Sequence, residues 1–269
     1  MSNDPLDLIA SWGSAAAAGH VGRDGRRRHA GAEQTIFAWA SVTKIVTALA
    51  IWVAVEEGTV SWEDPAGPEG STLRHLLAHA SGLDPDRDAI LARPGQRRIY
   101  SNRGIEVAAA HLADAAGMPF AAYAGEAVIG PLGMTSTVFD GSPASGARGT
   151  ITDLLALAAE LQQPTLIADQ TWAEVTATAF PGLRGVLPGF GLQEHNDWGL
   201  GVEIRGHKEP HWTGASNSPA TFGHFGRSGS MLWVDPVAGV ALAALADRPF
   251  GAWATEAWPV LSDAVLTAR

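Results

Sequence analysis

The arrangement of apolar and polar positions along the chain changes twice, from a strand pattern to a helix pattern and back again. Small and apolar residues around 14–22 and 33–39 predict strands joined by a turn at Asp24-Gly25. A short helix over 4–12 is expected before them, because an Asp-Pro pair at its start supplies a cap and a residue suited to the first helical position. Two or three strands are therefore predicted near the N-terminus.

The middle of the chain has a helix pattern. The segment from Ser41 to Glu57 is apolar on nearly every side and is followed by Gly58, which predicts a buried helix. Between about 62 and 180, apolar residues recur every three to four positions, with Gly and Pro at the breaks. The helices expected there cover 71–79, 102–116, 119–129, 150–162 and 166–178. Gly and Pro then crowd 181–191, which has no period and is interpreted as a functional loop.

Strand patterns return in the last quarter of the chain. The expected strands run from Trp198 to Ile204, Thr221 to Phe225, Met231 to Val234 and Val237 to Ala246, with a turn at Asp235-Pro236 and a closing amphipathic helix over 251–268. The sheet must then be assembled from both ends of the chain. This predicts an α+β fold, in which an antiparallel sheet is flanked by helices and carries an all-helical insert.

We expect a single catalytic unit over residues 1–269. Residues 1–61 and 198–269 would form the sheet part, and residues 62–197 the mainly helical part with the cleft loops. The boundary between the sheet and the helices is the natural place for a cleft. The loops at 84–99 and 181–197 would then determine which substrate fits.

Composition removes several classes of protein. With 46% hydrophobic and 17% charged residues the chain is expected to fold as a globular protein, and the absence of cysteine excludes disulfides, thiolate nucleophiles and cysteine-bearing metal sites. A net charge of −10 disfavours nucleic-acid binding, and the basic run Arg26-Arg27-Arg28-His29 is interpreted as a solvated turn. We see no signal peptide and no apolar run of membrane-spanning length, so we expect a cytoplasmic protein without membrane association.

A Ser-x-x-Lys motif lies at the start of the most apolar predicted helix. Lys44 is one of only two lysines, and burying an ammonium there is costly unless it is paired or its pKa is lowered. Ser41 lies one turn earlier on the same face, so a desolvated lysine could take its proton. The N–H groups at the helix start would stabilise negative charge at Ser41. Taken alone, the motif more often means a capping serine followed by a lysine that extends to solvent.

Two later segments strengthen the catalytic interpretation. Tyr100-Ser101-Asn102 places a phenol and a carboxamide just before a predicted helix. Gly223-His224-Phe225-Gly226-Arg227 lies on a predicted strand, where glycines would let a substrate approach the backbone. The chain contains neither a Gly-x-Ser-x-Gly elbow nor a Walker-type phosphate loop, which disfavours α/β-hydrolases and nucleotide enzymes.

With these three motifs in this order, the chain resembles the serine β-lactamase and penicillin-binding-protein superfamily, and within it the branch of class C β-lactamases, D,D-peptidases and esterases. The resemblance covers nearly the whole chain. Further matching segments are 37–44, 73–83, Pro131-Leu132-Gly133-Met134, Thr152-Asp153-Leu154 and Trp198-Gly199-Leu200-Gly201.

The resemblance implies a role for each motif residue. Ser41 would be the acylated nucleophile, Lys44 its base and Tyr100 the group that relays the proton to the leaving group. Asn102, His224, Gly226 and Arg227 would bind substrate, with the backbone N–H groups of Ser41 and Arg227 as the oxyanion hole. No cofactor or metal is implied; the partner would be a small-molecule ester, amide or peptide, and the oligomeric state is left open.

His224 departs from the family pattern, because lactamases of this branch usually carry Lys there. A histidine is charged only near or below pH 6.5 unless its pKa is shifted, so we expect activity to show a step at pH 6 to 7. The His-x-Gly variant resembles esterases, amidases and D-amino-acid peptidases of the family. An esterase-like serine hydrolase is therefore favoured over a β-lactamase or D-amino-acid peptidase, and a non-catalytic peptide- or lactam-binding protein is the alternative from another class.

The remaining histidines and tryptophans add little chemistry. His75 and His79 are four apart on a predicted helix, but the Glu of a zinc-binding His-Glu-x-x-His motif is absent, so both are interpreted as structural. For His207 and His211, a position in a loop that lines the cleft and a position exposed to solvent are equally expected. Among the ten tryptophans, we expect Trp39, Trp52 and Trp62 in the core, and Trp198 and Trp212 nearer the cleft.

Overall fold

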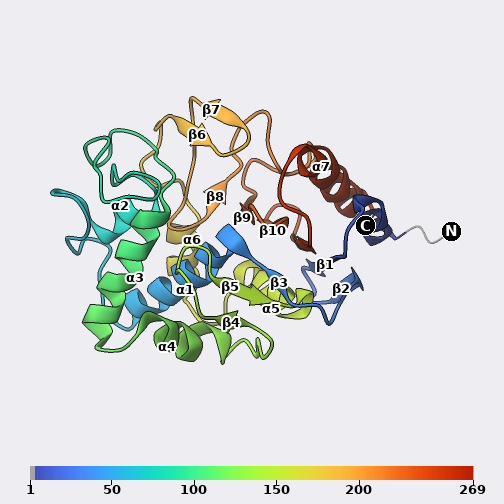
Figure 1. Ribbon diagram of the computed structural model, residues 1–269, viewed down its shortest axis with the longest axis horizontal. Helices are drawn as coiled ribbons and strands as arrows, with labels where there is room; N and C mark the ends of the chain where they lie inside the picture. Colours follow the sequence, from blue (N-terminus) through green and yellow to red (C-terminus); the bar gives the residue numbers. More distant parts are fainter. Residues whose placement is uncertain (1–3, 269) are drawn as a thin grey trace.

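A computed structural model describes residues 4–268 and contains a main sheet built from both ends of the chain (Figure 1). Its strands are β1 (Ala16–Gly22), β2 (Arg27–Gly31), β8 (Glu203–Ile204), β9 (Phe222–Gly226), β10 (Ser230–Asp235) and β11 (Val240–Ala246). They pair antiparallel in the order β2-β1-β11-β10-β9-β8. The predicted α+β class and the assembly of the sheet from two chain ends are confirmed.

The two central strands are buried on both faces. In β11, Ala241 and Ala243 belong to one apolar cluster, whereas Leu242 and Ala244 belong to a second. Successive side chains of a strand point to opposite faces, so the sheet separates two hydrophobic cores. This explains why β11 is a continuous apolar run with no alternation of polar residues.

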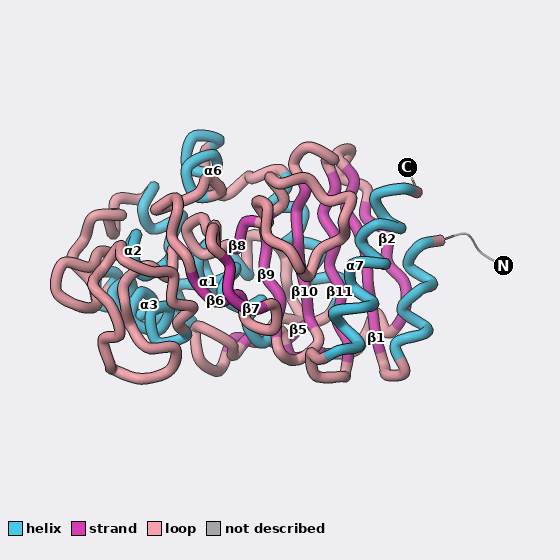
Figure 2. Tube along the Cα trace, turned by 90° about the horizontal axis from the view of Figure 1, so that it is seen from above, coloured by secondary structure: helices cyan, strands magenta, loops and turns pink. Residues whose placement is uncertain are grey.

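Helices cover each face of the sheet. On one face lie α7 (Ala252–Thr267) and the N-terminal 3₁₀ helix Pro5–Trp12, which lie side by side at the end of the molecule where both chain termini are found (Figure 2). The opposite face packs against α5 (Ile151–Gln162) and α1 (Thr43–Glu56). Nearly all of α1 is buried, as its sequence predicts, because it is enclosed between the sheet and the helical part.

Helices occupy each of the predicted positions in the middle of the chain. Besides α1 and α5 they are α2 (Leu73–Leu77), α3 (Asn102–Ala116), α4 (Phe120–Ala124) with a following π-helical turn Gly125–Ile129, and α6 (Asp169–Val175). The first and last are shorter than expected. Within residues 4–268, no helix combines the length and apolar character needed to cross a membrane.

The prediction of an all-helical insert was wrong in two places. A small sheet in the order β3-β5-β4 is formed by β3 (Phe37–Ala38), β5 (Ala147–Gly149) and β4 (Val138–Phe139). The segment 181–191, predicted to be irregular, contains most of a hairpin of β6 (Gly185–Leu187) and β7 (Gly191–Gln193). Strands of two or three residues are too short to show an alternating pattern in sequence.

The N-terminal hairpin also differs from the prediction. Its turn lies at Asp24-Gly25 as expected, but the second strand is β2 and not a strand over 33–39, of which only β3 is extended. The basic run 26–29 is therefore mostly strand and not a turn. Its arginine side chains are exposed, as predicted, because β2 is an edge strand. Charged side chains on an edge strand are compatible with pairing on one side only.

Candidate active site

Ser41 lies in a 3₁₀ turn, Ala40–Val42, that leads directly into α1. The backbone of Ala40 has a φ of 43°, a left-handed conformation that is unfavourable for a residue with a side chain. Such strain is typical of functional sites, where the surrounding structure imposes it. Because Ser41 is in the first turn of this 3₁₀ helix, its own backbone N–H has no acceptor one turn earlier within the helix.

Lys44 is completely buried and has three oxygen neighbours. Its Nζ lies 2.6 Å from Asn102 Oδ1, 2.8 Å from the carbonyl oxygen of Ala144 and 3.2 Å from Ser41 Oγ. Burial lowers the pKa of Lys44 to about 7. The carbonyl and the amide oxygen can only accept, so a neutral Lys44 donates to both and directs its lone pair at the Ser41 hydroxyl.

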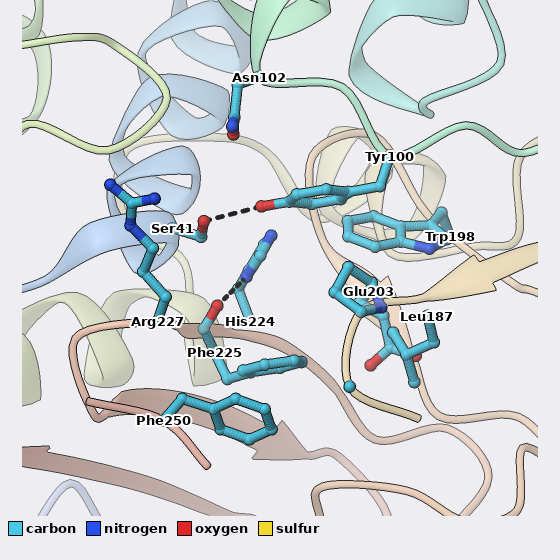
Figure 3. A pocket seen from close by; sticks show the side chains of 12 residues that line it. Ser41, Tyr100, Asn102, Leu187, Trp198, Glu203, His224, Phe225, Arg227 and Phe250 are labelled. Carbon is cyan, nitrogen blue, oxygen red and sulfur yellow. Dashed lines mark hydrogen bonds between the residues drawn. The ribbon is translucent and has the colours of Figure 1, made fainter. Parts of the chain in front are cut away.

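Tyr100 contacts the same serine from the other side. Its phenolic hydroxyl donates to Ser41 Oγ at 2.8 Å (Figure 3). Desolvation raises the pKa of Tyr100 above its usual range, so at neutral pH the group is a phenol and a proton donor. The structure therefore brings Ser41, Lys44 and Tyr100 together and leaves Lys44 as the group suited to act as a base.

Tyr100 is held by aromatic neighbours. Its ring centroid lies 4.7 Å from that of His79 and 5.8 Å from that of Trp198, and the His79 and Trp198 rings meet edge to face at 4.5 Å. The backbone N–H of Ser101 donates to Nδ1 of His79 at 3.2 Å. His79 is thus a positioning group behind the phenol, a role that sequence analysis did not identify.

His75 and His79 do not form a pair. His75 lies in α2 and contacts the N-cap residue Thr72, whereas His79 lies beyond the end of that helix with a φ of 53°. Within residues 4–268, no group of three or more histidine or acidic side chains is arranged to hold a metal ion.

Asn102 begins α3 and orients the lysine. Its Oδ1 accepts from Lys44, and its Nδ2 donates to Asp86 Oδ1 at 2.8 Å. The two contacts fix the orientation of the amide. Asn102 also lines the cavity beside Ser41, so the predicted substrate contact is within its reach.

His224 lies on β9 and is neutral. Its Nδ1 faces the carbonyl oxygen of Phe225 at 2.7 Å and must carry the proton, because that oxygen only accepts. Nε2 is buried and has no partner among the described residues. Burial, followed by the charge of Lys44, lowers the pKa of His224 to about 3. The expected step at pH 6 to 7 therefore cannot come from this imidazole.

Gly226, the last residue of β9, and Arg227, which follows it, have different surroundings. Among the described residues, Gly226 is not one of those that line the cavity beside Ser41. A Cβ atom at position 226 would lie 2.5 Å from the carbonyl oxygen of Trp39 and 3.1 Å from Cβ of Ala40. A side chain at position 226 would clash, because β9 packs here against the turn that carries Ser41. The exposed side chain of Arg227 lies at the edge of the cavity next to Ser41 (Figure 3).

These elements enclose an inner cavity of about 220 Å³. Its walls are largely apolar, and Ser41, Tyr100 and His224 supply polar atoms at one end (Figure 3). The lining residues are Ser41, Tyr100, Asn102, Leu187, Pro188, Gly189, Trp198, Glu203, His224, Phe225, Arg227 and Phe250. Trp198 belongs to this wall, while Trp39, Trp52 and Trp62 are in the core as predicted.

Glu203 is a buried acid at the cavity that sequence analysis missed. It forms an ion pair with Lys208 at 2.5 Å and accepts hydrogen bonds from Nε2 of His211 and Nε1 of Trp212, each at 3.0 Å. The neighbouring cation of Lys208 outweighs burial and holds the pKa of Glu203 below its usual range. The rarity of lysine in this chain was a signal for its partner Lys208, but no pattern indicated Glu203 itself. His207, by contrast, is exposed.

Comparisons with known proteins agree with this architecture. Residues 11–265 match the family model described as Beta-lactamase. The crystal structure of a beta-lactamase (Mb2281c) from Mycobacterium bovis is 50% identical, covers 98% of this chain and 99% of its own, and superposes with a TM-score of 0.97. EstCE1, a hydrolase with promiscuous acyltransferase activity, has a TM-score of 0.78 at 20% identity over 97% of this chain and 96% of its own, a likeness of fold alone.

Curated relatives are matched over part of their length. The D-alanyl-D-alanine-carboxypeptidase/endopeptidase AmpH of Escherichia coli (strain K12) is 28% identical over 39% of this chain and 37% of its own. Penicillin-binding protein 4* of Bacillus subtilis (strain 168) is 29% identical over 38% of this chain and 30% of its own. The matched region thus spans about a third of the length of these relatives.

Proposed function

Since the chain belongs to the beta-lactamase family, we propose that it is a serine hydrolase that cleaves small uncharged esters or amides through an acyl-enzyme on Ser41. One observation carries the proposal. The hydroxyl of Ser41 lies within hydrogen-bond distance of both Lys44 Nζ, at 3.2 Å, and the Tyr100 hydroxyl, at 2.8 Å. The amine of Lys44, whose pKa is lowered, can act as a base toward the nucleophile, and the neutral phenol of Tyr100 can act as an acid.

Acylation begins when neutral Lys44 takes the hydroxyl proton as Ser41 Oγ attacks the carbonyl carbon. Backbone N–H groups at the start of the helix and after β9 stabilise the oxyanion. Tyr100 then donates its proton to the leaving oxygen or nitrogen and regains one from the Lys44 ammonium, whose Nζ lies 4.8 Å from the phenol ring centroid. A water molecule then attacks the acyl-enzyme while the same groups transfer protons in the reverse order, which releases the carboxylic acid and restores Ser41.

The inner cavity favours an uncharged acyl group. His224 is neutral where lactamases of this branch have a lysine, and the nearby walls are Phe225 and Phe250. A substrate carboxylate beside His224 would lose its hydration shell without forming an ion pair there, which is unfavourable. This supports neutral esters or amides over penicillins and cephalosporins.

β-Lactam hydrolysis is the second candidate. A protein described as a beta-lactamase is 50% identical to this chain over nearly its full length, and Arg227 offers a cation at the cavity edge. A lactam whose carboxylate reached Arg227 could still acylate Ser41.

Turnover of a substrate panel tests the proposal. The panel contains short acyl nitrophenyl esters, D-amino-acid amides, penicillins and cephalosporins, with fluorophosphonate labelling of the same samples. We expect labelling of Ser41 and a kcat/KM for neutral esters well above that for the lactams. A higher kcat/KM for lactams would favour the second candidate, and absence of both labelling and turnover would contradict the hydrolase assignment.

A further inference from the structure

A second, larger cavity adjoins the inner one. It has a volume of about 720 Å³, within the range of small-molecule sites, and shares Tyr100 and Pro188 with the inner cavity. We call it the outer groove. It lies between the loop 85–99 and the β6–β7 hairpin, which are neighbours in Figure 1. Its wall is formed by Pro85, Leu91, Arg97, Arg98, Ile99, Tyr100, Arg184, Gly185, Val186, Pro188 and Leu192.

The two sides of the outer groove are joined firmly at its base. Arg98 and Gly185 form a parallel bridge, and the Arg98 N–H donates to the carbonyl oxygen of Arg184 at 3.0 Å. A Cβ at Gly185 would lie 2.2 Å from the carbonyl oxygen of Arg98, so only glycine permits this approach. The buried Arg98 guanidinium also donates to the carbonyl oxygens of Ala179 and Asn196. The groove is therefore preformed.

Apolar side chains are exposed along the outer groove. Leu91, Val186 and Leu192 are 48%, 57% and 53% exposed, and they account for three of the nine large exposed hydrophobic side chains among the described residues. Single exposed apolar residues are ordinary, but a group that lines one cavity beside a reaction centre indicates a binding surface.

Two arginines add positive charge to the same wall. Arg97 and Arg184 are exposed, and among residues 4–268 neither guanidinium has a hydrogen-bond or ion-pair partner. This is notable in a chain of net charge −10, where 28 acidic residues are available for pairing. Free guanidinium groups at an apolar groove are suited to an anionic ligand group, which they can hold with paired N–H donors.

The arginines are close in sequence to residues that line the inner cavity. Arg97 precedes Tyr100 by three residues, and Arg184 precedes Leu187 of the inner cavity by three residues along the extended β6. Three extended residues span at most about 10 Å, the length of a chain of about nine covalent bonds. The Cα atoms of Arg97 and Arg184 thus lie within reach of a medium-length alkyl chain from residues that line the inner cavity.

We propose that the outer groove binds an apolar arm of the substrate that ends in an anionic group, with Leu91, Val186 and Leu192 contacting the arm and Arg97 and Arg184 the anion. This inference rests on the proposed function, because it treats the groove as an extension of the site at Ser41. It is compatible with the neutral inner cavity, since the anion lies at the far end of the arm.

Matched ester pairs test the inference. On the acyl side, nitrophenyl decanoate is compared with the mono-nitrophenyl ester of decanedioic acid, in which nine bonds separate the two carbonyl carbons. On the alcohol side, decyl acetate is compared with the acetate ester of 10-hydroxydecanoic acid. We expect the carboxylated member of one pair to have a kcat/KM about fivefold or more above its neutral partner, and the preference to fall with added salt. The side that shows the preference identifies the arm.

Substitution of the arginines gives the decisive comparison. The double variant Arg97→Gln, Arg184→Gln should lose the preference while keeping its kcat/KM for neutral esters. Arg27→Gln removes one charge from an exposed arginine on β2, far along the main sheet, and should keep the preference. Equal kcat/KM within both pairs, or a preference that survives the double substitution, would overturn the inference.

A binding measurement separates this inference from the proposed function. Dansylaminoundecanoate is titrated into Ser41→Ala, with and without the two arginine substitutions, and its fluorescence is followed. Binding that weakens about tenfold in the arginine variant supports the outer groove even if no ester is turned over. Equal binding by both proteins overturns it. The hydrolase assignment fails separately, if Ser41 is unlabelled and no ester is cleaved.

Discussion

Lys44 Nζ lies 3.2 Å from Ser41 Oγ, and Asn102 and Ala144 accept from the other two positions of the same amine. A neutral lysine in this setting has only one direction for its lone pair, which is toward the serine hydroxyl. The activity of the site should therefore follow the protonation of Lys44.

The pH dependence of kcat/KM tests this directly. Burial lowers the pKa of Lys44 to about 7, and the neutral form is the base, so kcat/KM for a neutral ester should rise with pH to a plateau with a midpoint near 7. Lys44→Met should reduce turnover by about 10³-fold or more. A flat profile from pH 5 to 9, or near-normal turnover by Lys44→Met, would place the base elsewhere.

Stability should report the same pKa. Between pH 7 and about 10 the unfolded chain binds a proton at Lys44 that the folded protein does not, because the folded pKa is about 7 and the ordinary value 10.5. The free energy of unfolding of the wild type should therefore increase relative to Lys44→Met by about 1.4 kcal/mol per pH unit across this window, and stay constant below it. Urea unfolding of both proteins at pH 6, 7, 8 and 9 measures the difference. A difference independent of pH would mean that Lys44 has an ordinary pKa.

Tyr100 is expected to donate a proton and not only to pack. Tyr100→Phe keeps the ring against His79 and removes the hydroxyl that contacts Ser41, so kcat should fall by about 10²-fold with KM little changed. Tyr123→Phe is the matched control, because this other tyrosine binds Glu57 and does not line either cavity described above. Equal activity of the two variants would reduce Tyr100 to a wall of the pocket.

His224 should influence selectivity without setting the pH profile. Its pKa of about 3 keeps it neutral at neutral pH, so His224→Gln should leave the midpoint near 7 unchanged. His224→Lys would place a second cation near Lys44, which lowers the pKa of Lys44 further and moves the midpoint to lower pH. The same cation should raise lactam hydrolysis, because it can pair with the lactam carboxylate. Loss of the step in His224→Gln would assign the titration to the imidazole after all.

The fold could be predicted to a large extent because its long elements have clear patterns. The apolar runs of α1 and β11 and the Asp24-Gly25 turn can be recognised without any neighbour. The strands β3, β4 and β6 could not, since two or three residues carry no periodicity. In addition, β3 pairs with β5, which lies far away in the sequence. The edge strand β2 was hidden by its arginines, which suit an exposed edge as well as a turn.

The site divides in the same way. Ser41, Lys44, Tyr100 and Asn102 occur in short motifs, and the structure brings them together. Glu203 could not be found from sequence, because its significance comes from Lys208 and His211, which approach it only in the fold. The neutral state of His224 is likewise a property of burial and of the Phe225 carbonyl, which no motif records.

Mass spectrometry of a trapped intermediate can show whether Ser41 is acylated during turnover. The protein is mixed with a short acyl nitrophenyl ester, quenched in acid within the first turnovers, and analysed intact and after digestion. We expect a mass increase equal to one acyl group, located on Ser41, and neither adduct nor turnover in Ser41→Ala. An acyl group on a different residue, or ester hydrolysis by Ser41→Ala at the wild-type rate, would contradict this expectation.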